Sequence, residues 1–230
     1  MVQGSFHQNG RLIRPVRAEK WILSCGMGEF LGMLVAGSTM FLLSRYQPET
    51  RSVDTQMITL VILLMAGAAE GALIGFFQWR ILRKMAPGIQ ANSWIGITIL
   101  AALVAWGLGS APGWVLNPSE AASQGILFDP PLWLMVLGGA GSGIVLGALF
   151  GIFQNMVLKN FIANQWAWTL HNALGWAVAM AWIFLAAGLT GADWPLWRVA
   201  IMAATGGGLA GLSLGWVTAF FFRKRQLLRP

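Results

Sequence analysis

Two acidic residues stand inside long apolar segments, where a carboxylate charge is costly. Glu29 lies eight residues after Trp21, and Glu70 lies nine residues before Trp79. At about 1.5 Å of rise per helical residue, these positions are roughly 12 Å and roughly 13.5 Å inside two successive segments. Ionisable residues at such depth in a membrane commonly serve an ion or proton pathway or bind a ligand. The pair therefore indicates a site for a proton, a cation or an amine.

Helical geometry predicts that the two carboxyl groups approach each other. One face of the first segment carries small residues with Glu29 at its edge: Cys25, Gly28, Gly32 and Ala36. A second stripe of small residues flanks Glu70: Gly67, Gly71 and Gly75. If the two stripes pack together, the acids share at least one proton near neutral pH or hold a cation. The alternative is a protonated acid that only hydrogen bonds to a neighbour and helps to specify the fold.

Three further polar side chains are candidate ligand-binding residues. Gln78 and Gln154 follow glycine-rich phrases, and they either contribute to a polar ring or hydrogen bond across helices. His171 lies early in the fifth apolar segment, where it either bonds at a helix interface or ligates a haem or a pigment. The sequence has neither an HxxxH nor a CxxC pattern, so no metal site is expected, and no cofactor is assigned.

The phrase GxxxGxxxGxx followed by a polar residue occurs three times, at intervals of 76 and 64 residues. Its glycines are Gly67, Gly71 and Gly75; Gly143, Gly147 and Gly151; and Gly207, Gly211 and Gly215. Glycines four residues apart share a helix face and allow close helix packing in lipid. The segments before the phrases open at Trp21, Trp94 and Trp166, 73 and 72 residues apart. This internal repeat predicts three tandem helical hairpins joined by glycine-zipper packing.

The elements that position these residues are membrane-spanning helices. With 57% hydrophobic and 10% charged residues, the chain cannot bury its apolar surface in a water-soluble core. Six segments reach the roughly 20 residues needed to cross a bilayer: about 21–44, 57–79, 94–116, 132–158, 166–189 and 196–222. We expect an all-α polytopic membrane protein with a single domain over 20–224. Its three parallel repeats cover about 20–85, 92–160 and 164–224, between polar tails at 1–19 and 225–230.

The distribution of the net charge of +7 predicts an orientation. Twelve of the 15 basic residues flank one side of the predicted spans: Arg11, Arg14, Arg17, Lys20, Arg80, Arg83, Lys84, Lys159, Arg223, Lys224, Arg225 and Arg229. Lys and Arg concentrate on the cytoplasmic side, so we expect both termini there. The same distribution argues against nucleic acid as a partner. The first apolar segment is too long for a cleaved signal peptide.

The run from Gly71 to Arg83, GALIGFFQWRILR, followed by Trp94, resembles a phrase in uncharacterised multi-pass bacterial membrane proteins, often cyanobacterial, with tandem hairpins. The resemblance covers most of the chain. It implies a bacterial inner membrane or a thylakoid membrane, and it implies no particular activity.

The fourth and sixth segments are similar in texture to the catalytic helices of rhomboid proteases, but this resemblance is rejected. Ser142 stands in AGSG rather than GxSG, and Thr205 takes the place of a histidine before the last glycines. A serine without a base is not activated, so no enzyme is expected.

Two functions remain open from the sequence. One is a binding or transport protein for a small ligand, proton or cation that uses the acid pair. The other is a non-transporting subunit of a larger photosynthetic or respiratory membrane complex, whose glycine faces and tryptophans contact other subunits or pigments. The lipid bilayer is the expected partner in both.

Overall fold

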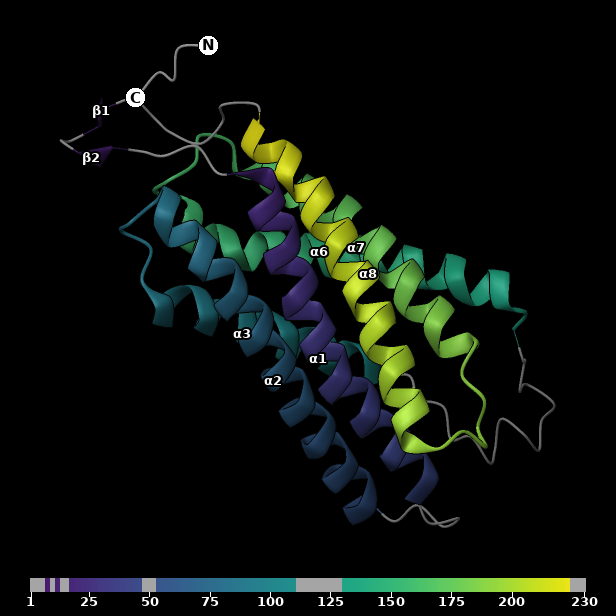
Figure 1. Ribbon diagram of the computed structural model, residues 1–230. Helices are drawn as coiled ribbons and strands as arrows, with labels where there is room; N and C mark the ends of the chain where they lie inside the picture. Colours follow the sequence, from purple (N-terminus) through teal and green to yellow (C-terminus); the bar gives the residue numbers. More distant parts are fainter. Residues whose placement is uncertain (1–6, 9–10, 13–16, 47–52, 111–129, 224–230) are drawn as a thin grey trace.

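The computed structural model describes residues 7–8, 11–12, 17–46, 53–110 and 130–223. Six long helices account for nearly all of them (Figure 1). They are α1 (Ala18–Tyr46), α2 (Val53–Met85), α3 (Ala91–Ser110), α6 (Leu132–Leu158), α7 (Gln165–Gly188) and α8 (Leu196–Arg223). Two short strands, β1 (His7–Gln8) and β2 (Arg11–Leu12), form an antiparallel pair ahead of α1. The expectation of helices alone is therefore corrected by this small local hairpin.

All six helices are long and apolar enough to cross a membrane. The chain is thus a multi-pass helical protein suited to a lipid bilayer. The predicted spans agree with the helices in number and order. The third was predicted to reach residue 116, whereas α3 is described to Ser110. Residues 111–116, most of the predicted tail at 1–19 and the tail at 225–230 lie outside the described residues.

Local chemistry explains where two of the helices begin. Pro131 precedes α6 with an extended backbone (φ −60°, ψ 152°), the conformation from which proline commonly leads into a helix. Asn164 precedes α7, and its side-chain oxygen accepts a hydrogen bond from the backbone N–H of Ala167 at 3.0 Å. This cap satisfies one of the donors that a helix start leaves free.

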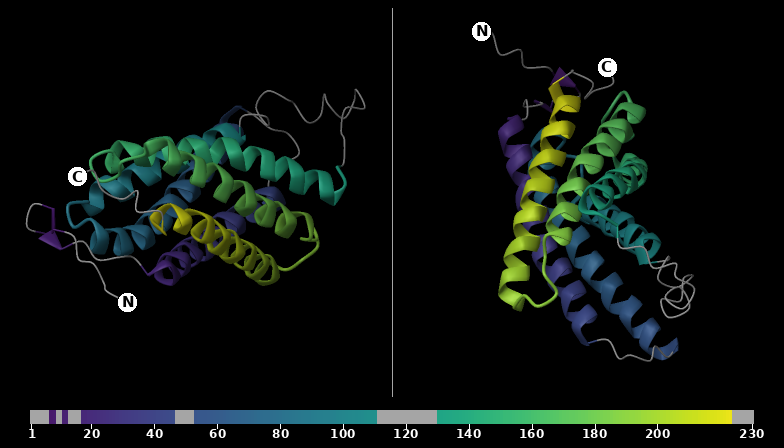
Figure 2. Two further views of the ribbon diagram at one scale, coloured as in Figure 1. Left: turned by 90° about the horizontal axis from the view of Figure 1, so that it is seen from above. Right: turned by 90° about the vertical axis from the view of Figure 1, so that its right-hand side faces the viewer.

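Each helix contacts the next one along the chain, and α8 contacts α1, so that the six helices form a closed ring. Figure 2 shows α8 lying beside both α1 and α7. We call the end where α1, α3 and α7 begin the basic end, because it carries most of the described basic residues: Arg17, Lys20, Arg80, Arg83, Lys84 and Lys159. Arg45 and Arg198 lie at the opposite end.

Three tryptophans form the core of the basic end. Trp21, Trp94 and Trp168 are fully buried, and the Trp168 ring lies 6.2 Å from Trp21 and 6.5 Å from Trp94 between centroids. The sequence analysis had aligned Trp166 with Trp21 and Trp94, which is wrong, because Trp166 is 81% exposed. Residues two apart on a helix point about 200° from each other, so only one of the two can face the core.

Candidate intramembrane acid site

Glu29 is fully buried on α1, between α2 and α8. A Cβ added at Gly211 of α8 would lie 2.7 Å from the Cβ of Glu29, and Gly28 beside it lies against Ile74 of α2. Neither carboxyl oxygen of Glu29 has a hydrogen-bond partner among the described residues. An ionised carboxylate in this position would be both desolvated and unpaired, which is a very costly state.

Glu70 on α2 is 6% exposed and has one hydrogen bond. The indole Nε1–H of Trp106 on α3 donates to its Oε2 at 2.7 Å. Gly32 of α1, three residues after Glu29, leaves room for Glu70, because a Cβ at Gly32 would lie 2.8 Å from the Glu70 Cγ. Glu70 is near enough for the carboxyl groups to interact electrostatically. The structure therefore brings the two predicted acids into one buried region.

The reason given for this approach needs correction, since the two small-residue stripes do not pack together. Gly67, Gly71 and Gly75 of α2 face α3, where a Cβ at Gly71 would lie 2.7 Å from the Cβ of Ala102. Gly28 and Gly32 of α1 instead meet the neighbouring face of α2, which carries Ile74 and Glu70. Because α2 lies between α1 and α3, its glycines and its acid serve different contacts.

The other two glycine phrases also lie at close helix contacts. Gly143 and Gly147 meet the backbone of α7, and a Cβ at Gly151 would lie 2.6 Å from the Cα of Thr169. Gly207 and Gly211 meet the backbone of α1, and a Cβ at Gly215 would lie 2.8 Å from the Cα of Ile22. These contacts join the even-positioned helices in the chain to α3, α7 and α1, and not to their own predicted hairpin partners.

The polar residues that end the glycine phrases are buried near the tryptophans of the basic end. The Gln154 Nε2–H donates to Gln78 Oε1 at 3.3 Å, and the Gln78 Nε2–H donates to the sulfur of Cys25 at 3.8 Å. Thr218, the third member, accepts a 2.8 Å hydrogen bond from the Trp21 Nε1–H. Gln78 and Gln154 thus meet each other, and Cys25 links them to the helix that carries Glu29.

His171 lies in a different environment from the acids. The ring is half-buried, Nδ1 lies 2.6 Å from the backbone oxygen of Ala167, and the ring meets Phe221 edge to face at 5.9 Å between centroids. Among the described residues, these contacts tie His171 to α7 and α8 and not to Glu29 or Glu70. Its assignment to a haem or pigment stays a prediction.

No basic side chain is available inside the spans to neutralise the acids. Lys and Arg are absent from residues 21–44 of α1, 57–79 of α2 and 91–110 of α3, and from the whole of α6 and α7. Within the described part of the chain there is also no group of three or more His, Cys, Asp or Glu residues that could hold a metal ion.

Trp106 is the functional neighbour that sequence reasoning missed. It was interpreted only as packing bulk, yet its indole donates to Glu70 and covers Gly67. A large residue opposite a glycine is a usable signal, but the pairing of α2 with α3 had to be known first.

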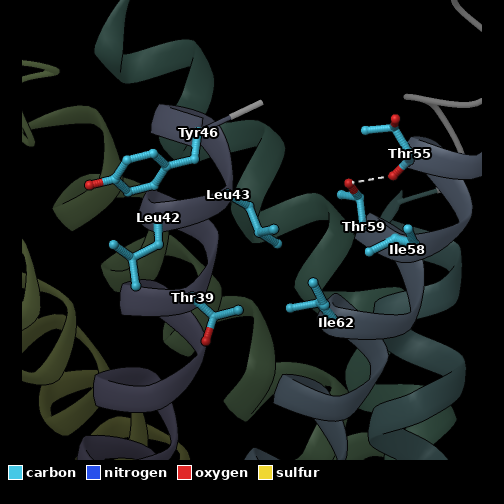
Figure 3. A pocket seen from close by; sticks show the side chains of 8 residues that line it. All are labelled: Thr39, Leu42, Leu43, Tyr46, Thr55, Ile58, Thr59 and Ile62. Carbon is cyan, nitrogen blue, oxygen red and sulfur yellow. Dashed lines mark hydrogen bonds between the residues drawn. The ribbon is translucent and has the colours of Figure 1, made fainter. Parts of the chain in front are cut away.

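A groove between α1 and α2 opens at the end opposite the basic end (Figure 3). It encloses about 380 Å³ and is lined by Thr39, Leu42, Leu43, Tyr46, Thr55, Ile58, Thr59 and Ile62. Thr39 and Ile62 are seven and eight residues from Gly32 and Glu70. The groove therefore lies about two helical turns from the acid site.

Comparison with protein-family models, with curated proteins and with solved structures finds no match to this chain. Function must therefore be argued from the site itself.

Proposed function

We propose that this chain binds or transports a proton or a small cation at Glu29 and Glu70, within the bilayer. The observation that carries the proposal is Glu29, a fully buried carboxyl group with both oxygens unpaired among the described residues. Buried charge in a membrane interior is tolerated where it is compensated, and a bound proton or cation supplies that compensation.

The surrounding packing supports a small occupant. Ile74, Phe150 and Leu214 are buried at the centre of the ring, and Phe150 stacks on Trp176 at 4.9 Å between centroids. Helices in glycine contact approach too closely to leave a wide aqueous pore between them. A proton, or a cation that has lost its water shell, suits this interior better than a large hydrated substrate.

The proposed architecture is three tandem hairpins closed by glycine-zipper contacts around a pseudo-threefold axis. The spacing supports it, since Trp21, Trp94 and Trp168 follow one another at 73 and 74 residues. With these intervals Glu29 corresponds to Ala102 and Trp176, and Glu70 corresponds to Leu146 and Ala210. Only the first unit carries acids, which is consistent with one specialised repeat supported by two others.

The proposed orientation places the basic end in the cytoplasm of a bacterial inner membrane, or on the corresponding side of a thylakoid membrane. The contrast in basic residues between the two ends supports it.

Proton movement into proteoliposomes tests the proposal. Purified protein is reconstituted with a pH-sensitive dye inside, and a proton gradient or a potassium diffusion potential is imposed. Wild-type protein should acidify the interior faster than empty liposomes, and Glu29→Gln and Glu70→Gln should lower the rate at least tenfold while remaining folded. Glu19→Gln, an exposed acid on the same helix, is the matched control and should behave as wild type.

Sodium uptake measured in the same vesicles distinguishes a cation from a proton. Rates for protons and sodium that are unchanged in both Gln variants would contradict the proposal.

The alternative, a non-transporting subunit, has less support. It rests on exposed apolar side chains such as Trp133 and Trp197, which a lipid boundary already explains. Native mass spectrometry of mildly solubilised protein would favour this alternative if defined partner chains or pigments were retained.

A further inference from the structure

Three polar atoms buried at the basic end lack a hydrogen-bond partner among the described residues. They are the indole Nε1–H donors of Trp94 and Trp168 and the amide oxygen Oε1 of Gln154. All three side chains are at most 1% exposed. A buried polar group without a partner is unfavourable, and nearly all such groups in proteins are paired with protein or with ordered water.

Equivalent helix contacts place these atoms in one region. Each last glycine of a phrase meets the residue that follows a buried tryptophan: Gly75 meets Ile95, Gly151 meets Thr169 and Gly215 meets Ile22. Three residues after each of these glycines come Gln78, Gln154 and Thr218. Gln154 is therefore placed toward Trp168 as Thr218 is placed toward Trp21.

The three contacts differ in how the indole is satisfied. The short Thr218 hydroxyl accepts directly from Trp21 at 2.8 Å. The longer Gln154 and Gln78 amides bond to each other instead, at 3.3 Å. Trp94 and Trp168, whose rings are 6.5 Å apart, are left with free donors, and Gln154 is left with a free acceptor.

We propose that a buried water molecule binds among Trp94, Trp168 and Gln154. It would accept a hydrogen bond from each indole N–H and donate one to Gln154 Oε1, which gives the three bonds typical of an internal water. An anion would use the two donors but would be repelled by the amide oxygen, and a cation would be repelled by both N–H groups. The donor set thus selects a neutral molecule that both accepts and donates.

This water site extends toward the acids, a step that rests on the proposed function. Gln154 bonds to Gln78 and Gln78 bonds to Cys25. Glu29 is four residues after Cys25 on α1, one helical turn further into the bundle. The site is therefore the basic-end terminus of a continuous polar path, by which protons reach Glu29 from that end.

Nuclear magnetic resonance tests the water site directly. The protein is labelled with ¹⁵N-tryptophan in detergent micelles, and single Trp→Phe variants assign the indole signals. Cross peaks to water are expected for the indole protons of Trp94 and Trp168 and not for that of Trp21. Gln154→Met, which removes the acceptor at similar volume, should weaken both cross peaks at least threefold.

The same spectra contain the overturning result. Absence of water cross peaks at both Trp94 and Trp168, with the Trp21 signal present in the folded protein, would refute the site. If a Phe variant fails to fold, the signals that shift in Gln154→Met supply the assignment.

The polar path has a separate reporter, because Cys25 is the single cysteine of the chain. Its S–H stretching band is followed by infrared spectroscopy after transfer to D₂O. We expect exchange at least tenfold slower in Gln154→Met than in wild type. Thr218→Val is the matched control in the same polar layer, and it should leave the rate unchanged.

Equal exchange rates in wild type and Gln154→Met would refute the path. Glu29→Gln separates the two proposals, since it should abolish proton flux without changing thiol exchange. Intact flux in Glu29→Gln and Glu70→Gln together with Gln154-dependent exchange would refute the acid site and leave the water site standing.

Discussion

The two acids have different surroundings, and the difference suggests different roles. Glu70 accepts a hydrogen bond from Trp106, which fixes its carboxyl group against α3. Glu29 has no such donor among the described residues. Because Glu29 is held only by packing, it is the group whose occupancy by a proton or cation can change without breaking a protein hydrogen bond.

The hydrogen bond between Trp106 and Glu70 makes a prediction about stability. Trp106→Phe keeps an aromatic ring over Gly67 but leaves a buried carboxyl oxygen without its donor, which costs about 1–3 kcal/mol. We expect a lower melting temperature in detergent, measured by circular dichroism. Trp133→Phe makes the same change at an exposed indole and is the control. Equal melting temperatures for the two variants would show that the bond contributes nothing.

At the scale of elements, the glycine contacts hold neighbouring helices close enough for backbones to touch. Gly143 faces the carbonyl of Trp176 on α7, whereas Gly141, two residues earlier on the same helix, has nothing within 4 Å of an added Cβ. One helix thus offers a buried and an open glycine for comparison.

Gly143→Ala should force α6 away from α7 and destabilise the protein by about 1–3 kcal/mol, the usual cost of overpacking. Gly141→Ala should be neutral or stabilising by up to about 1 kcal/mol, because alanine is the better helix former. Chemical denaturation in mixed micelles measures both. A Gly141→Ala variant as unstable as Gly143→Ala would contradict the close contact.

At the scale of the whole molecule, the ring of helices places basic residues mainly at one end, and the orientation follows from that distribution. In a Cys25→Ala background, Ser44→Cys reports on the end opposite the basic end and Lys159→Cys on the basic end, both at exposed positions. A membrane-impermeant maleimide should label Ser44→Cys in spheroplasts and label Lys159→Cys only after permeabilisation. The reverse pattern would invert the proposed orientation.

Composition and spacing alone were sufficient for the six membrane helices and for the two acids as the exceptional buried charges, because these follow from local hydropathy. They were not sufficient to choose Trp168 over Trp166 as the core residue, or to show that the glycines of α2 meet α3. Nor could they identify Trp106 as the partner of Glu70. These features depend on how the helices rotate and which neighbours they take, and both are decided by packing among segments distant in the chain.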